Sequence, residues 1–139
     1  MTSTTDTPLC TENDITLLVR DFYASVRRDE MLGPVFEAHV DDWDKHLVKL
    51  VHFWSSILLR TGRYTGNPMQ KHVALPGLNP ALFERWLALF QATTAAHPNQ
   101  AMAREAYAAA QRIARSLWFA YQMKNAPHEL PKELNPQCA

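Results

Sequence analysis

The chain has 139 residues, of which 47% are hydrophobic and 20% are charged, and its 14 basic and 14 acidic residues leave a net charge of zero. This composition predicts one ordinary globular domain and excludes disordered, fibrous and membrane-spanning classes. No cluster of Lys and Arg forms the basic stripe typical of nucleic-acid binding, so neither nucleic acid nor a membrane is expected as a partner.

Both ends of the chain are polar and are predicted to lie outside the domain. Residues 1–12 are rich in Thr and lack the basic and apolar segments of a signal peptide, which predicts a cytoplasmic protein with a disordered N-terminal tail. Residues 126–139 contain three prolines and are expected to form a disordered C-terminal tail. Cys10 and Cys138 are expected to be free thiols, with a disulfide between the tails as the alternative. The domain is therefore expected over residues 13–125.

Helical spacing of apolar residues dominates the first half of the domain. A helix is expected from Asn13 or Asp14, with Asn13 as its cap, and its apolar stripe comprises Ile15, Leu18, Val19, Phe22, Tyr23 and Val26. Pro34 suits the first position of a short helix that carries Val35 and Phe36. A longer helix is then expected from Asp41 or Asp42 to Leu58, with Thr61-Gly62 after its end. At about 100° per residue, His46 lies on its apolar side and His52 does not.

A long irregular segment separates this part from the second half. Three glycines and three prolines between Gly62 and Pro80 predict a loop, with room for one short helical turn around residues 68–73. Asn79 and Pro80 predict the start of a helix that His97-Pro98-Asn99 closes, and a last helix is expected from about Gln100 to Lys124. No strand-like alternation appears, so the domain is expected to be all-α. A loop this long is uncommon unless it has a function such as wrapping around a ligand.

The histidines are the candidates for chemistry. His72 lies in the long loop, where a buried imidazole would need a partner such as a metal. The chain has no His-Glu-x-x-His, no Glu-x-x-His pair and no Cys/His knuckle, which excludes the common metal-ion sites. Inward-facing His46, Tyr23 and large aromatics suit a flat apolar cofactor held by one imidazole, namely haem. For His46 alone, a hydrogen-bonded core histidine is the alternative. The histidines expected to be solvated are His39, His97 and His128.

The order of several short motifs resembles that of one known family. The motifs are Phe22-Tyr23, Leu32-Gly33-Pro34-Val35-Phe36, Trp43-x-x-His46, Phe53-Trp54, Tyr64-x-Gly66-x-Pro68, Lys71-His72 and Trp86-Leu87. Together they resemble the group III truncated haemoglobins over residues 14–124. The absence of the Gly-Gly pairs used by other truncated globins agrees with this group. The resemblance implies a globin-like two-over-two helical sandwich.

The resemblance also implies roles for individual residues. His72 is expected to be the proximal ligand of the haem iron, and Tyr23, His46 and Trp86 are expected to form the distal set that donates hydrogen bonds to a bound gas. Apolar contacts with the macrocycle are expected from Phe36, Leu50, Phe53, Met69, Leu78, Phe83, Ile113 and Leu117, each of which is also a credible core residue. Lys49, Tyr64 and Lys71 are expected near the haem propionates, with a solvated role as the alternative for the lysines.

The expected function follows from the same resemblance. Haem b would bind O2, NO or CO reversibly, in oxygen transport or in NO and oxygen detoxification or redox chemistry. One alternative is a haem enzyme, either an NO dioxygenase or a peroxidase. It would need an external reductase, because the chain contains no flavin or nicotinamide motif. The other alternative is a haem-free helical interaction module.

Overall fold

The computed structural model describes residues 8–62, 72, 75, 77–130 and 132–134. Within these residues the secondary structure is helical, without a strand, and no helix combines the length and the apolar character needed to cross a membrane. The helices are α1 (Glu12–Arg28), α2 (Gly33–His39), α3 (Trp43–Leu58), α5 (Pro80–Ala95) and α6 (Gln100–Asn125).

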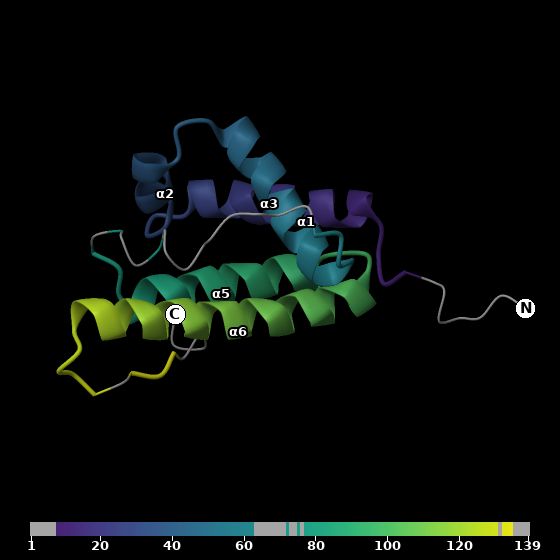
Figure 1. The fold of residues 1–139 in the computed structure, drawn as a ribbon. Coiled ribbons are helices and arrows are strands. Elements are labelled where there is room, and N and C mark those ends of the chain that lie inside the picture. The colour runs from purple at the N-terminus through teal and green to yellow at the C-terminus, as the bar shows by residue number, and fades with distance from the viewer. Residues whose placement is uncertain (1–7, 63–71, 73–74, 76, 131, 135–139) are drawn as a thin grey trace, which may run out of the picture.

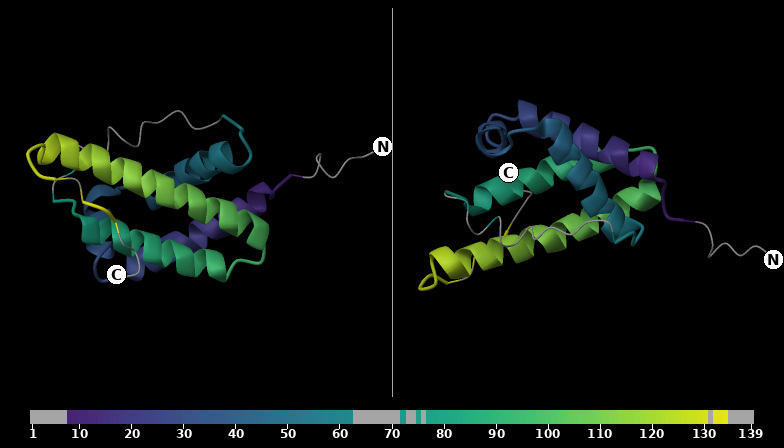
Figure 2. Two further views of the ribbon diagram at one scale, coloured as in Figure 1. Left: turned by 90° about the horizontal axis from the view of Figure 1, so that it is seen from below. Right: turned by 45° about the horizontal axis from the view of Figure 1, so that its top comes forward.

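The long helices form two layers. In Figure 1, α1 and α3 cross each other above α5 and α6, which lie side by side along their length. The view from below in Figure 2 shows α6 beside α5, with α1 and α3 behind them. Short α2 packs against α1 at the end of the upper layer. This is the two-over-two arrangement expected from the sequence.

Side-chain caps fix where the long helices begin. Asp42, Asn79 and Asn99 cap α3, α5 and α6, where their side chains accept hydrogen bonds from backbone N–H groups of the first turn. The expected cap of α1 at Asn13 is wrong, because Thr11 holds that position. The Thr11 hydroxyl accepts from the Asp14 N–H at 3.1 Å, and the Asp14 carboxylate accepts from the Thr11 N–H at 3.0 Å. This reciprocal capping box starts the helix two residues earlier.

A closely packed part of the core lies at one end of the sandwich, where α1 begins, α5 ends and α6 begins. Ile15 of α1 and Met102 of α6 are completely buried, and Phe90 of α5 is 1% exposed. Phe90 stacks on Trp54 of α3 with ring centroids 5.1 Å apart. Small residues of α6, among them Ala106 and Ala110, are also completely buried, which lets neighbouring helices approach closely. The opposite end of the sandwich holds a cavity.

His97 is not solvated as expected, because the turn between α5 and α6 folds under the start of α1. Its side chain is 5% exposed. The Nδ1 atom accepts from the Asn99 N–H at 2.9 Å, so the Nε2–H is left to donate to the Asp14 carbonyl oxygen at 3.0 Å. Both ring nitrogens are therefore used in holding the turn against α1.

The described part of the C-terminal segment returns to α6. The Trp118 indole N–H donates to the Lys132 carbonyl at 3.0 Å, and the Gln122 amide donates to the Leu130 carbonyl at 2.7 Å. The Gln122 Oε1 atom also accepts from the Lys132 N–H at 3.1 Å. At the other end Cys10 is a buried free thiol, whereas Cys138 and residues 1–7 lie outside the described part of the chain.

Ser55 of α3 generates a stability prediction. Its side chain is completely buried and its hydroxyl has no hydrogen-bond partner. Folding therefore removes the hydrogen bonds between this hydroxyl and water and puts no others in their place. Ser55→Ala should therefore stabilise the protein by about 1 kcal/mol or more and raise Tm by a few degrees. Thermal unfolding followed by circular dichroism measures the change. The matched control is Ser56→Ala at the half-buried neighbour, which should give no gain, and a lower Tm for Ser55→Ala would contradict the prediction.

Candidate functional site

An apolar cavity of about 410 Å3 lies between the layers, at the end opposite the dense core. Its walls come from the second half of α1, from α2 and α3, from the first half of α5 and the second half of α6, and from the segment that precedes α5. This volume lies within the range of about 300–1,000 Å3 typical of small-molecule pockets.

The cavity gathers every described residue that the sequence singles out for the site. These are Tyr23, Phe36, His46, Lys49, Leu50, Phe53, His72, Leu78, Phe83, Trp86, Ile113 and Leu117. Residues as far apart in the chain as Tyr23 and Leu117 thus share one space. Tyr64, Met69 and Lys71 lie outside the described residues, so their expected places are not seen. The individual roles stay predictions, but the shared location supports a single site.

Sequence reasoning missed part of the wall. The additional lining residues are Leu32, Val35, His39, Val40, Trp54, Leu75, Leu82 and Ala114. Leu82 and Ala114 directly neighbour residues that were expected in the wall. Because the buried face of a helix is wide enough to include adjacent positions, these two residues could have been predicted. His39 is exposed, as expected of a solvated residue, but it also lines the cavity. No local pattern indicates that the corner after α2 faces the cavity.

Tyr23 is the most buried polar group in the cavity wall. Its side chain is 5% exposed, and its ring lies edge-on to Phe36 at 5.7 Å and to His46 at 6.3 Å. Burial raises the pKa of Tyr23 well above its ordinary value, although a hydrogen bond from the Trp86 indole opposes this. The phenol is therefore neutral at physiological pH. With the Trp86 indole N–H as a donor toward its oxygen, the phenol can give its own proton to another acceptor.

Trp43 packs against the rings that surround this polar group. Its ring stacks on Phe36 at 6.3 Å and meets the edge of His46 at 5.6 Å. The Arg27 guanidinium lies 4.6 Å from the Trp43 ring centroid and covers its outer side. The Trp43 indole nitrogen is buried without a hydrogen-bond partner. Trp43 therefore limits the space in which the His46 ring can move.

His72 reaches the cavity from the segment between α3 and α5. It is half-buried, and its carbonyl accepts a hydrogen bond from the Leu75 N–H at 3.1 Å. Further along, the Leu78 N–H donates to the Tyr121 hydroxyl of α6 at 3.1 Å. Gly77, with φ of 76°, makes the turn that brings the chain from Leu75 to Leu78. Tyr121 thus fixes the end of this segment against α6.

The side chains that could act as metal ligands limit what kind of group the cavity could hold. Within the described residues, no group of three or more His, Cys, Asp or Glu side chains could hold a metal ion. Among these residues a bare metal ion would therefore not find the set of three or four ligands that it usually needs. A flat apolar cofactor that brings its own in-plane ligands needs only one imidazole from the protein and fits the cavity wall.

Comparison with known proteins places the chain in a family. No family model matches it. The group 3 truncated haemoglobin of Campylobacter jejuni is 36% identical over 107 residues, which cover 74% of this chain and 84% of that protein. The chain belongs to the group III truncated haemoglobins. This confirms the family indicated by the order of motifs in the sequence.

Comparison with solved structures agrees with the assignment of this truncated haemoglobin to group III. The crystal structure of a group III truncated haemoglobin from Campylobacter jejuni matches it with a TM-score of 0.75 at 32% sequence identity. The match covers 87% of this chain and 96% of that structure. The expected all-α truncated-globin fold is therefore confirmed.

The burial of Tyr23 in this truncated haemoglobin predicts an alkaline loss of stability. The folded state holds the phenol proton more tightly than the unfolded chain, in which tyrosines ionise near about pH 10. The free energy of unfolding should therefore fall as the pH rises above about 10, and Tyr23→Phe should reduce that fall. Urea unfolding across this pH range measures it.

The control for the alkaline experiment is Tyr107→Phe, at a half-buried tyrosine of α6. Its effect should be smaller, because water still solvates that phenolate. If the wild type and Tyr23→Phe lost stability equally above about pH 10, Tyr23 would not be the group that resists ionisation.

Proposed function

We propose that the chain binds haem b in this cavity, with His72 as the proximal ligand, and that it binds O2, NO or CO reversibly on the side of Tyr23. The observation that carries the proposal is that one apolar cavity brings together His72, Tyr23 and Trp86. Haem, when bound, supplies the iron to which such gases bind.

Two histidines line the cavity, and their surroundings favour different roles. His46 packs edge-on against Tyr23 and Trp43, at 6.3 and 5.6 Å between ring centroids. This places it among the groups that would face a bound gas. His72 lies on the separate segment before α5, next to the turn at Gly77 that Tyr121 anchors through Leu78. We therefore assign the proximal imidazole to His72.

The polar groups at and around Tyr23 have different roles toward a bound gas. The Trp86 indole N–H lies where it can donate to the Tyr23 oxygen, and this interaction lowers the pKa of Tyr23. Trp86 therefore orients the phenol, and Tyr23 donates its own proton to the partly negative outer atom of the gas. His46 would supply a second, weaker donor from α3. In this arrangement Trp86 is a positioning residue and Tyr23 is the group that touches the ligand.

The rim of the cavity suits the charged edge of the cofactor. Lys49 is exposed and also lines the cavity, so its ammonium group can pair with a propionate while its stem covers apolar surface. His39 lines the same cavity and is likewise exposed. A haem-free interaction module would have no use for an apolar cavity of this size between its helices, whereas a haem protein requires one.

Haem stoichiometry tests the proximal assignment. The purified wild type should take up about one haem per chain, because a haem site of this type uses a single protein axial ligand. His72→Ala should lose tight haem binding. The matched control is His52→Ala, a half-buried histidine of α3 that is not in the cavity wall, which should keep it. Retention of haem by His72→Ala with an unchanged ferrous carbonyl spectrum would show that His72 is not the ligand.

The oxygen dissociation rate tests the distal assignment. Tyr23→Phe keeps the ring and removes only the hydroxyl, so the loss of one hydrogen bond of about 1–3 kcal/mol should raise the rate about fivefold to 150-fold. His46→Leu should raise it less. Stopped-flow measurements with both variants decide between the two donors. The reverse order, a large effect of His46→Leu and none of Tyr23→Phe, would make His46 the principal donor.

A further inference from the structure

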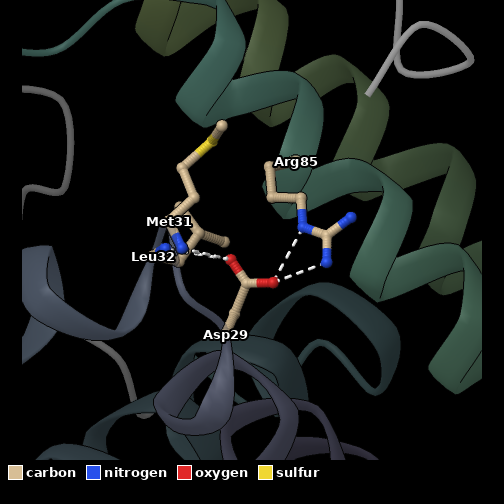
Figure 3. Close-up of polar contacts among 4 residues, drawn as sticks. All are labelled: Asp29, Met31, Leu32 and Arg85. Carbon is tan, nitrogen blue, oxygen red and sulfur yellow. Dashed lines mark hydrogen bonds and ion pairs between the residues drawn. The ribbon is translucent and has the colours of Figure 1, made fainter.

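Asp29, which caps the C-terminal end of α1, collects hydrogen bonds from two directions, as Figure 3 shows. One carboxylate oxygen accepts from the backbone N–H groups of Met31 and Leu32 at 3.1 and 2.9 Å. The other accepts from Arg85 of α5, at 2.8 Å from Nε and 2.6 Å from Nη2. The Asp29 side chain is 5% exposed and that of Arg85 is 37% exposed.

This pair differs from an ordinary surface salt bridge in its burial and in its use of both oxygens. Burial alone would raise the pKa of Asp29, but the hydrogen bonds from Arg85 and Leu32 outweigh it and lower the pKa below its ordinary value. By comparison, the Arg27–Glu37 pair at the same end of α1 is 46% and 52% exposed. Exposed pairs of that kind contribute little, whereas loss of Arg85 would leave the buried Asp29 carboxylate without its cation.

The pair joins the parts of the fold that carry the distal residues. Asp29 ends the helix that holds Tyr23, and Leu32, whose N–H it accepts, lines the cavity. Arg85 directly precedes Trp86, which lines the same cavity as Tyr23 and, like Tyr23, packs edge-on against Phe22. The turn itself cannot shift easily, because Gly33 donates to the Asp29 carbonyl at 2.9 Å and a Cβ at Gly33 would lie 2.9 Å from the Arg27 carbonyl oxygen.

We propose that the Asp29–Arg85 ion pair positions Trp86 against Tyr23, and thereby sets how firmly Tyr23 holds a bound gas. α1 and α5 contact each other along their length, and Phe22 meets the edge of Trp86 at 5.3 Å. Such aromatic contacts have preferred geometries, but each contributes only modestly beyond its buried area, so small slides and rotations remain possible. The ion pair has a more restricted geometry, so it favours the register in which the Trp86 indole lies against the Tyr23 phenol.

The inference rests on the proposed haem function, and the test separates the two. Arg85→Met keeps the length of the side chain and removes its donors. In the carbon monoxide complex it should add or broaden C–O stretching bands and shift the Trp86 indole N–H resonance, which Trp86→Phe identifies by its loss. The oxygen dissociation rate should rise about three- to tenfold. Arg28→Met removes a cation from the same surface hollow but leaves the pair intact, and it should change none of these.

A double-mutant cycle distinguishes positioning from general stability. In a Trp86→Phe background, Arg85→Met should raise the dissociation rate less than about twofold, because the hydrogen bond that it acts through is already absent. If Arg85→Met does not fold, Arg85→Lys replaces it, since lysine keeps the charge but lacks the planar fork. The oxygen dissociation rate of Arg85→Lys should lie between those of the wild type and Trp86→Phe.

Two results would overturn the inference while leaving the haem function in place. One is an unchanged C–O band, indole resonance and dissociation rate in the Arg85 variant, with only Tm lowered. The other is an equal rise in rate with and without Trp86. If instead the wild type took up no haem, the proposed function itself would fail before any Arg85 variant was measured.

Discussion

The structure depends on keeping an apolar cavity open inside a small helical domain. Protein interiors normally pack as densely as organic crystals. A cavity of about 410 Å3 lacks the apolar contacts that would otherwise fill it, which lowers stability unless a ligand supplies them. The helices must therefore hold the cavity in a shape that a ligand fills. A family of haem proteins has that requirement, and the chain belongs to it.

The division of the sandwich into two ends meets this requirement. Ile15, Phe90 and Met102 fill the end where α5 turns into α6, and the buried His97 ties that turn to the start of α1. At the other end the same helices diverge around the cavity, and polar contacts replace dense packing. The Asp29–Arg85 pair holds α1 to α5 there, and Tyr121 holds the segment before α5 to α6. The dense end supplies stability, and the open end supplies the site.

The helices and most of the cavity wall could be predicted because their signals are local. Apolar residues spaced by one helical turn identify the buried faces, and Asn79-Pro80 identifies the start of α5 in the sequence as in the structure. Once Tyr23 and Leu117 are placed on inward faces, their convergence on one cavity requires only that the helices pack together.

Features that depend on tertiary contacts could not be predicted in the same way. The burial of His97 depends on α1 passing over a turn that lies far along the chain, and nothing near His97 indicates it. Asp29 and Arg85 are likewise distant in the sequence and look like ordinary surface charges. The Thr11 cap was missed for a different reason, since Asn13 is an equally good cap by type and only the carboxylate of Asp14 decides between them.

We propose that haem lies in this cavity with its iron bound to His72 and its other face toward Tyr23 and Trp86. A crystal structure of the protein with haem bound tests it most directly. The account predicts the His72 ring nitrogen at coordinating distance from the iron, with the Tyr23 hydroxyl, held by the Trp86 indole, facing the opposite side. A structure in which another side chain occupies the proximal position, or in which Tyr23 points away from the haem, would contradict it.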